Sequence, residues 1–242
     1  MNKRIIIVFV CLLLLTCTTL AQDAPLLIEL EAEDGLLLQG DYWASNADSM
    51  PEEGVPAVLL LHIVNSSRDA WQPLIEPLLA AGYHVLAVDM RGHGATGGSK
   101  DWPAAETDVQ LWLDWLKEQP NTQSVVIIGG SIGSNLSLIG CANDPDCRTA
   151  IALSPGLDFF DVMPENAVVE ELQDRPVLLI ASHDDSSSAI AVRQMASNSR
   201  GEIAMRIYNG RAHGTSMLTS AYGERLISLI VNWLDEHTQP IP

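Results

Sequence analysis

The feature that most constrains the fold is a regular alternation of short, wholly apolar runs with longer segments of helical periodicity. The apolar runs predict strands at 57–62, 84–89, 124–128, 150–153, 177–181 and 203–208. Helical spacing covers 71–81, 104–119, a segment ending near 142, 189–197 and 223–237. Strands that are apolar throughout are typical of a parallel sheet buried on both faces. We therefore predict an α/β fold with helices on both faces of a mostly parallel sheet.

Two earlier strands are predicted to form a hairpin at one edge of this sheet. Segments 26–31 and 36–43 flank Asp34-Gly35, a dipeptide typical of tight turns. A tight turn requires antiparallel pairing, so the sheet has eight strands of which the first is antiparallel. We predict a single domain over residues 22–242.

The first 21 residues have the features of a secretory signal peptide. Lys3 and Arg4 precede the apolar run 5–15, and Thr19-Leu20-Ala21 offers small residues at the cleavage positions. We predict a signal peptide at 1–21, export to the periplasm or the extracellular space, and no stable membrane insertion after cleavage. The alternatives are an uncleaved anchor, disfavoured because the apolar run is short, and lipidation of Cys17, disfavoured by the bulky residue before it.

The charge balance excludes polyanionic partners. Asp and Glu number 31 against 13 Lys and Arg, which gives a formal net charge of −18 at pH 7. Such a chain repels nucleic acid and anionic lipid and suits a small neutral ligand. Hydrophobic residues make up 47% of the chain, which is enough for a packed core and excludes disorder.

Export also determines how the cysteines are interpreted. Cys11 and Cys17 leave with the signal peptide, so Cys141 and Cys147 remain as an even pair. Two cysteines this close in an oxidising compartment predict a local disulfide after a helix.

A nucleophile motif lies between a predicted strand and a predicted helix. Gly129-Gly130-Ser131-Ile132-Gly133 matches G-x-S-x-G, which needs this strand-to-helix context. The turn is strained, so the residues two positions from the serine must lack side chains. Ser131 then projects its hydroxyl above the sheet, at the N-terminus of a helix.

The serine needs a base, and His213 is the predicted one. In enzymes with this motif the acid follows the serine and the histidine follows the acid. Three of the six histidines precede Ser131, and His183 precedes any acid on its own loop. His237 is expected on an exposed face of the terminal helix. His213 remains, directly after the last predicted strand.

In these features the chain resembles the α/β-hydrolases, particularly the dienelactone hydrolases and small serine esterases. The resemblance covers most of residues 26–237 and is carried by His62 after its strand, Asp89-Met90-Arg91-Gly92-His93-Gly94, the Gly-Gly-Ser-Ile-Gly motif, Asp185 and Ala212-His213-Gly214. It implies the α/β-hydrolase fold, and it implies that the run at 89–94 is a structural loop that shapes the site.

The resemblance also suggests the acid of the triad. Aligned on the end of the strand at 177–181, Asp185 falls where the family places its acid, with Asp184 as the alternative. A metal site at His183-Asp184-Asp185 is disfavoured because adjacent residues do not readily converge on one ion.

Two backbone N–H groups are expected to stabilise an oxyanion. One belongs to Ile132, directly after the serine. The other is expected in the loop after His62, at Ile63 or Val64. The family usually has glycine after this histidine, and Ile63 is less free to adopt a positive φ. Ile63 and Val64 therefore both remain candidates for the second donor.

The connection after the predicted strand at 150–153 is short for this family, in which many members insert a helical cap there. It has room for one short helix at about 165–172, so no sizeable cap and an open site are expected. Four apolar residues in it either line an acyl or alcohol pocket or pack the loop onto the body. They are Leu157, Phe159, Phe160 and Met163.

Taken together, the residues predict a secreted serine hydrolase that cleaves small carboxylic esters without a metal or cofactor. Ser131 would attack the carbonyl, His213 would move the proton, and Asp185 would orient His213. The alternatives are an exopeptidase or amidase with the same triad, and a binding protein that uses this fold without catalysis.

The cysteine prediction is tested by counting thiols. Thiol titration of the denatured, unreduced mature protein is expected to find no free cysteine, because Cys141 and Cys147 are bonded to each other. Two free thiols would contradict the disulfide and weaken the argument for export.

Overall fold

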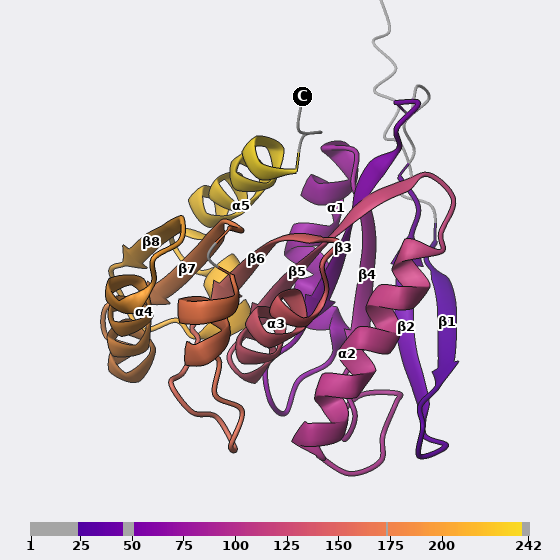
Figure 1. The fold of residues 1–242 in the computed structure, drawn as a ribbon, viewed down its shortest axis with the longest axis horizontal. Coiled ribbons are helices and arrows are strands. Elements are labelled where there is room, and N and C mark those ends of the chain that lie inside the picture. Colours follow the sequence, from indigo (N-terminus) through magenta and orange to yellow (C-terminus); the bar gives the residue numbers. More distant parts are fainter. Residues whose placement is uncertain (1–23, 46–50, 173, 239–242) are drawn as a thin grey trace, which may run out of the picture.

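One eight-stranded sheet organises the protein (Figure 1). The computed structural model describes residues 24–45, 51–172 and 174–238; the predicted signal peptide, with Cys11 and Cys17, lies outside these residues. The strands are β1 Leu26–Glu31, β2 Leu37–Trp43, β3 Val55–Leu61, β4 His84–Asp89, β5 Thr122–Gly130, β6 Cys147–Leu153, β7 Val177–Ser182 and β8 Ile203–Tyr208. Their spatial order is β1-β2-β4-β3-β5-β6-β7-β8.

The pairing confirms the predicted fold class. β1 runs antiparallel to β2, and β2 runs antiparallel to β4. The pairs from β4 and β3 across to β8 are all parallel. The predicted hairpin is therefore at one edge, and the carboxyl ends of the six parallel strands share one edge of the sheet.

In the part of the chain that the structure describes, five α-helices cover the sheet in two layers (Figure 1). They are α1 Gln72–Ala80, α2 Trp102–Lys117, α3 Ile132–Asn143, α4 Ser186–Asn198 and α5 Gly223–His237. Side chains of α2, α3 and α4 share one apolar core with the sheet, and those of α1 and α5 share a second core on the opposite face. Of the helices that the structure describes, none combines the length and hydropathy needed to cross a bilayer.

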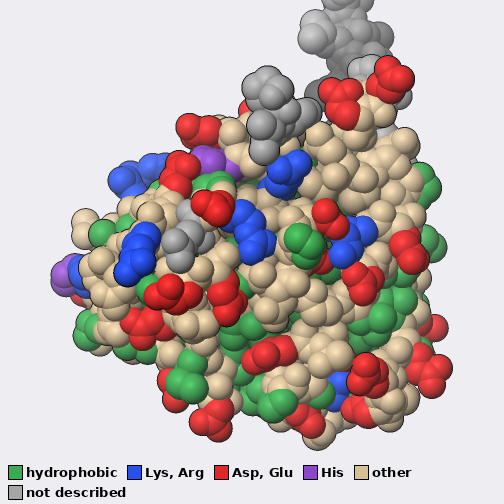
Figure 2. All heavy atoms as spheres, viewed as in Figure 1, with side chains coloured by type: hydrophobic (Ala, Val, Ile, Leu, Met, Phe, Trp, Pro, Cys, Tyr) green, Lys and Arg blue, Asp and Glu red, His purple; other side chains and the backbone are tan. Residues whose placement is uncertain are grey.

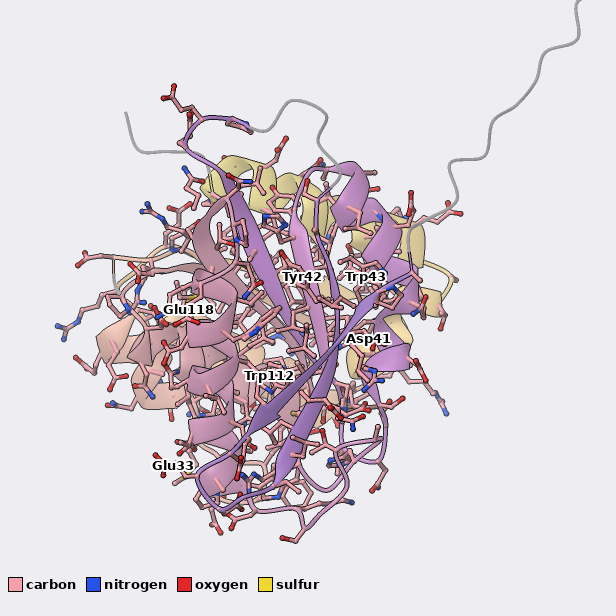
Figure 3. All side chains as sticks on the ribbon, turned by 90° about the vertical axis from the view of Figure 1, so that its right-hand side faces the viewer. Glu33, Asp41, Tyr42, Trp43, Trp112 and Glu118 are labelled. Carbon is pink, nitrogen blue, oxygen red and sulfur yellow. A yellow bond between two sulfur atoms is a disulfide. The ribbon has the colours of Figure 1, made fainter. Side chains whose placement is uncertain are left out.

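Neighbouring residues of β2 show how the two cores arise. Successive side chains of a strand point to opposite faces, so Tyr42 joins the core under α2 while Trp43 joins the core under α1 and α5. The Tyr42 ring meets Trp115 of α2 edge-on, with 5.1 Å between ring centroids. Figure 3 faces this edge of the sheet and labels both β2 residues, together with Trp112 on α2.

The loop after β4 has a structural role, in agreement with the resemblance. The Asp89 carboxylate accepts hydrogen bonds from the backbone and the guanidinium of Arg68, at 2.8 and 2.9 Å. Arg91 makes a two-pronged contact with Asp108 of α2, at 2.6 and 2.7 Å, and both side chains are buried. These pairs hold the loop at 89–94 against the body, since a buried charge is stable only when it is paired.

The described residues between β6 and β7, 154–172 and 174–176, form no sizeable cap. Within the described part of this connection, the chain is helical over 165–171, close to the expected helix at about 165–172, and its second part is the π-helical turn η2 Ala167–Glu171. Two other boundaries in the structure differ from the predicted ones. The helix predicted at 71–81 begins with a 3₁₀ turn, η1 Arg68–Trp71, and β5 reaches Gly130 instead of residue 128.

Cys141 and Cys147 lie at the junction of α3 and β6. Cys141 is in the last turns of α3 and Cys147 begins β6, with Cα atoms 5.2 Å apart, a separation that suits a disulfide. The guanidinium of Arg175 donates to the carbonyls of Cys141 and Asp144, at 2.5 and 2.7 Å. Arg175 therefore satisfies carbonyl groups that the helix end would leave unpaired.

The surface reflects the acidic composition. Figure 2 shows acidic side chains over much of one face, with hydrophobic side chains among them near the lower edge. The loops that follow the parallel strands lie at this edge (Figure 1).

Candidate active site

Ser131 occupies a strained turn between β5 and α3. Its φ is 53° and its ψ is −121°, a sparsely populated conformation that costs about 1–3 kcal/mol and persists only where the surroundings enforce it. The Ser131 N–H donates to the carbonyl of Leu153, at the end of the neighbouring strand β6, at 2.9 Å. Because α3 begins directly after Ser131, the unpaired N–H groups of the helix N-terminus gather beside it.

The glycines of the motif permit two close backbone approaches. A Cβ atom at Gly129 would overlap the carbonyl of Gly133, across the turn. A Cβ atom at Gly133 would overlap the carbonyls of Leu61 and His62, where α3 packs against the end of β3. Residues with side chains at these two positions would force the turn apart, as the strained motif requires.

Asp185, and not Asp184, is the acid beside His213. The Nδ1 atom of His213 lies 2.7 Å from Oδ2 of Asp185, and Asp185 is only 11% exposed. Asp184 is 57% exposed and pairs with the neighbouring His183 at 2.8 Å. The two adjacent carboxylates therefore turn to different histidines. Within the described residues, no cluster of three or more His, Cys, Asp or Glu side chains has the geometry of a metal site.

The loop that carries His213 lies against the backbone of the Ser131 turn. A Cβ atom at Gly214 would come within 3.4 Å of the Ser131 nitrogen. A Cβ atom at Gly130 would come within 3.1 Å of the Thr215 nitrogen. The segment that follows β8 and carries His213 therefore runs directly beside the turn that carries Ser131.

The hydrogen bonds of His62 define its tautomer. The Met90 N–H donates to Nε2 of His62 at 3.1 Å, so the proton of the neutral ring is on Nδ1. Nδ1 then donates to the carbonyl of Ile63 at 2.7 Å. Burial is the main cause that lowers the pKa of His62 to about 4, so the ring is neutral at pH 7.

This histidine favours Val64 over Ile63 as the second oxyanion donor. In a trans peptide the carbonyl of one residue and the N–H of the next point in opposite directions. Because the Ile63 carbonyl faces the buried ring of His62, the Val64 N–H is directed away from that ring. The loop's positive φ occurs at Asn65, with φ 57°, a residue type that tolerates it. Ile63 therefore needs no glycine-like conformation.

The four apolar residues of the β6–β7 connection differ in their burial. Leu157 and Phe159 are partly buried and pack against the core. Phe160 and Met163 are 57% and 59% exposed. Phe159 also meets the ring of His213 edge-on, with 6.4 Å between ring centroids. This residue therefore packs the loop and borders the site at the same time.

Asn135 of α3 holds this connection over the site. Its side-chain amide accepts from the Gly156 N–H at 3.0 Å and donates to the Val162 carbonyl at 2.8 Å. Between these anchors, Phe160 stacks on Trp102 at the start of α2, with 5.4 Å between ring centroids and 17° between ring planes. The connection is thus tied to both α2 and α3.

Three buried polar residues near the site, Asn135, Ser154 and Ser182, were not predicted from the sequence. Asn135 lies one helical turn after Ser131, and Ser154 and Ser182 stand at the carboxyl ends of β6 and β7. The rule that chemistry gathers where parallel strands end would have selected both serines. His237, which was expected on an exposed face of the terminal helix, is instead largely buried. Its side chain is only 10% exposed and stacks on Trp233, with 3.8 Å between ring centroids.

Comparison with known proteins agrees with this architecture. The profile of a family described as alpha/beta hydrolase fold matches residues 56–186, more than half of the chain. Among solved structures, an esterase of Pyrococcus furiosus superposes with a TM-score of 0.74 at 21% identity, covering 89% of this chain and 93% of the esterase. A dienelactone hydrolase of Anabaena variabilis superposes with a TM-score of 0.69 at 18% identity, covering 88% of this chain and 99% of that protein. The chain belongs to the α/β-hydrolase fold family, as its motifs suggested.

Sequence relatives match a shorter region. An (E)-2-((N-methylformamido)methylene)succinate hydrolase of Acinetobacter baylyi is 33% identical over 108 residues, which are 43% of this chain and 39% of that enzyme. A thermostable monoacylglycerol lipase of a Bacillus species is 28% identical over 113 residues, which are 44% of this chain and 43% of the lipase. The matches span less than half the length of either relative.

The depressed pKa of His62 predicts a specific pH dependence of stability. The folded state disfavours protonation of His62, so its contribution is complete above pH 6.5 and is lost as the pH falls towards 4. The loss amounts to about 3 kcal/mol. Urea unfolding of wild type and His62→Gln between pH 4 and 8 measures it, and the variant is expected to have the shallower slope below pH 6.5. Identical slopes would mean that the fold does not lower the pKa of His62, which would contradict a buried neutral ring that accepts the Met90 N–H.

The two aspartates predict different losses of activity on replacement. If Asp185 orients His213, Asp185→Asn lowers kcat for an ester by about 10³- to 10⁴-fold, because the amide favours the wrong tautomer of the histidine. Asp184→Asn, the matched control one residue away, is expected to keep kcat within about twofold, since an exposed carboxylate contributes little. A large loss confined to Asp184→Asn would reverse the assignment.

Proposed function

We propose that this protein is a secreted serine hydrolase that cleaves carboxylic esters through Ser131, His213 and Asp185. The main support is the 2.7 Å contact between His213 Nδ1 and Asp185, on a loop packed against the strained turn of Ser131. With Nδ1 committed to the carboxylate, Nε2 is the nitrogen that can accept the Ser131 proton. A serine hydroxyl is a weak nucleophile until such a base acts on it.

The proposed reaction has two steps. The Ser131 oxygen forms a bond to the ester carbonyl carbon as His213 takes its proton, and the alcohol leaves with that proton. A water molecule then gives its proton to His213, adds to the acyl-enzyme, and releases the acid with Ser131 restored. In each step the N–H groups of Ile132 and Val64 would stabilise the negative oxygen, a contribution that is large in enzymes of this type.

The surroundings of His213 favour substrates with an uncharged apolar group. Phe159 borders the imidazole, and the exposed Phe160 is held nearby by Trp102. The formal charge of −18 disfavours anionic substrates. The relatives named above are a hydrolase, a monoacylglycerol lipase and an esterase. We therefore propose small neutral esters as substrates, with an exported location as the sequence predicts.

Replacement of the nucleophile tests the proposal. Ser131→Ala is expected to abolish hydrolysis of short-chain p-nitrophenyl esters and labelling by a fluorophosphonate, with the melting temperature nearly unchanged. Ser137→Ala removes a buried hydroxyl of α3 and serves as the matched control, which is expected to keep activity. Hydrolysis retained by Ser131→Ala would mean that another residue is the nucleophile.

A substrate panel separates the alternatives. Esters from acetate to long-chain acyl groups, together with one aminoacyl amide, would be compared at equal concentration. Faster cleavage of the amide would favour an exopeptidase or amidase. A wild-type protein that neither turns over the panel nor reacts with the fluorophosphonate would be a binding protein.

A further inference from the structure

We propose that two buried serines, Ser154 and Ser182, position His213 by holding the residues on either side of it. The inference rests on the proposed function, since it concerns the base of the same site. Ser154 directly follows β6 and Ser182 ends β7, and both are 0% exposed. One binds Gly214 and the other binds Ala212.

Ser154 is bound to the chain directly after the histidine. Its hydroxyl accepts the N–H of Gly214 at 3.0 Å. Ser154 also has a φ of 57°, in the left-handed region that residues with side chains rarely adopt. Strain of this kind persists where the structure over-determines it, and it clusters at functional sites. The hydrogen bond from Gly214 to the Ser154 hydroxyl gives a reason for this strained conformation.

The same short segment also holds the nucleophile. The carbonyl of Leu153 accepts the N–H of Ser131 at 2.9 Å, and the next residue is Ser154. The end of β6 is thus hydrogen-bonded to the turn of Ser131 and to the loop of His213. One dipeptide sets the relative position of the two groups that must exchange a proton.

Ser182 is bound to the chain directly before the histidine. Its hydroxyl donates to the carbonyl of Ala212 at 2.5 Å. A serine hydroxyl has one proton, so the 2.6 Å contact with the Tyr222 hydroxyl must be donated by the tyrosine. Tyr222 is fixed by stacking on Tyr208, with 4.3 Å between ring centroids. The two consecutive hydrogen bonds, from Tyr222 to Ser182 and from Ser182 to Ala212, therefore end at the residue before His213.

These contacts matter because His213 lies at the surface. Its side chain is 37% exposed, so packing alone does not fix it. Asp185 holds the ring, while Ser154 and Ser182 hold the backbone on both sides. A displacement of about 1 Å at a reacting group can cost about 100-fold in rate. Positioning by these serines would therefore appear in kcat.

The kinetic test uses two replacements of Ser154. Ser154→Gly removes the hydroxyl and suits the positive φ, so it folds more readily, whereas Ser154→Ala removes the hydroxyl and keeps the strain. Both are expected to lower kcat for an ester by about 10- to 100-fold with KM nearly unchanged. Ser137→Ala, which loses a buried hydrogen bond to the Ser134 carbonyl, is the matched control and is expected to match wild type.

A double-mutant cycle shows whether Ser154 acts through His213. In a His213→Ala background, Ser154→Gly is expected to cause no further loss of the residual rate. A loss as large as in wild type would overturn the proposal, because Ser154 would then act on Ser131 or on the fold. Tyr222→Phe, which removes one hydroxyl from the second anchor, is expected to lower kcat in the same non-additive way.

A spectroscopic measurement is independent of turnover. The proton between His213 Nδ1 and Asp185 should give a far-downfield proton NMR signal, assigned by its loss in His213→Ala. Ser154→Gly is expected to shift or broaden this signal, and Ser137→Ala is expected to leave it in place. An unchanged signal in a folded Ser154→Gly protein would overturn the positioning role. A changed signal in a protein that cleaves no ester would support the positioning role while the proposed function fails.

Discussion

The site depends on one backbone constraint, the positive φ of Ser131 between a strand and a helix. This turn forms because Gly129 and Gly133 allow backbone to pass where any side chain would overlap a carbonyl group. Its strain is opposed by the hydrogen bond from the Ser131 N–H to Leu153 on the next strand. The turn therefore needs both its own glycines and a completed parallel sheet. The geometry of the Ser131 turn therefore depends on the assembled sheet.

Parallel strands bring the other groups to the same place. The segments after β3, β6, β7 and β8 all lie at the edge where the strands end, so residues far apart in the chain become neighbours. The proposed site residues Val64, Asp185 and His213 lie in the loops after β3, β7 and β8. Much of the precision comes from buried polar side chains at this edge. His62 orients a peptide, Asn135 ties down a loop, and two serines hold the chain around His213. Each is satisfied by hydrogen bonds, as buried polar groups must be.

Much of this was predictable because it depends on local pattern. Wholly apolar runs indicated the parallel strands, and Asp34-Gly35 indicated the edge hairpin, because burial and turn geometry act over a few residues. The Gly-Gly-Ser-Ile-Gly motif and the length of the β6–β7 connection were equally local. Errors occurred where tertiary contacts override local preference. β5 continues through Gly130 because β6 pairs with it, and His237 is covered because Trp233 stacks on it.

The sequence by itself determined the α/β architecture, the nucleophile motif and the candidate base, because spacing and strand order suffice for these. Only the tertiary structure showed that Asp185, and not Asp184, lies beside His213, and only it favoured Val64 over Ile63 as the proposed second oxyanion donor. It alone revealed Ser154 and Ser182. The physical reason is that each of these depends on the direction in which a loop peptide or side chain points. That direction is set by hydrogen bonds to residues distant in the chain, such as Gly214 to Ser154 across 60 positions. No pattern along the chain encodes such a pairing.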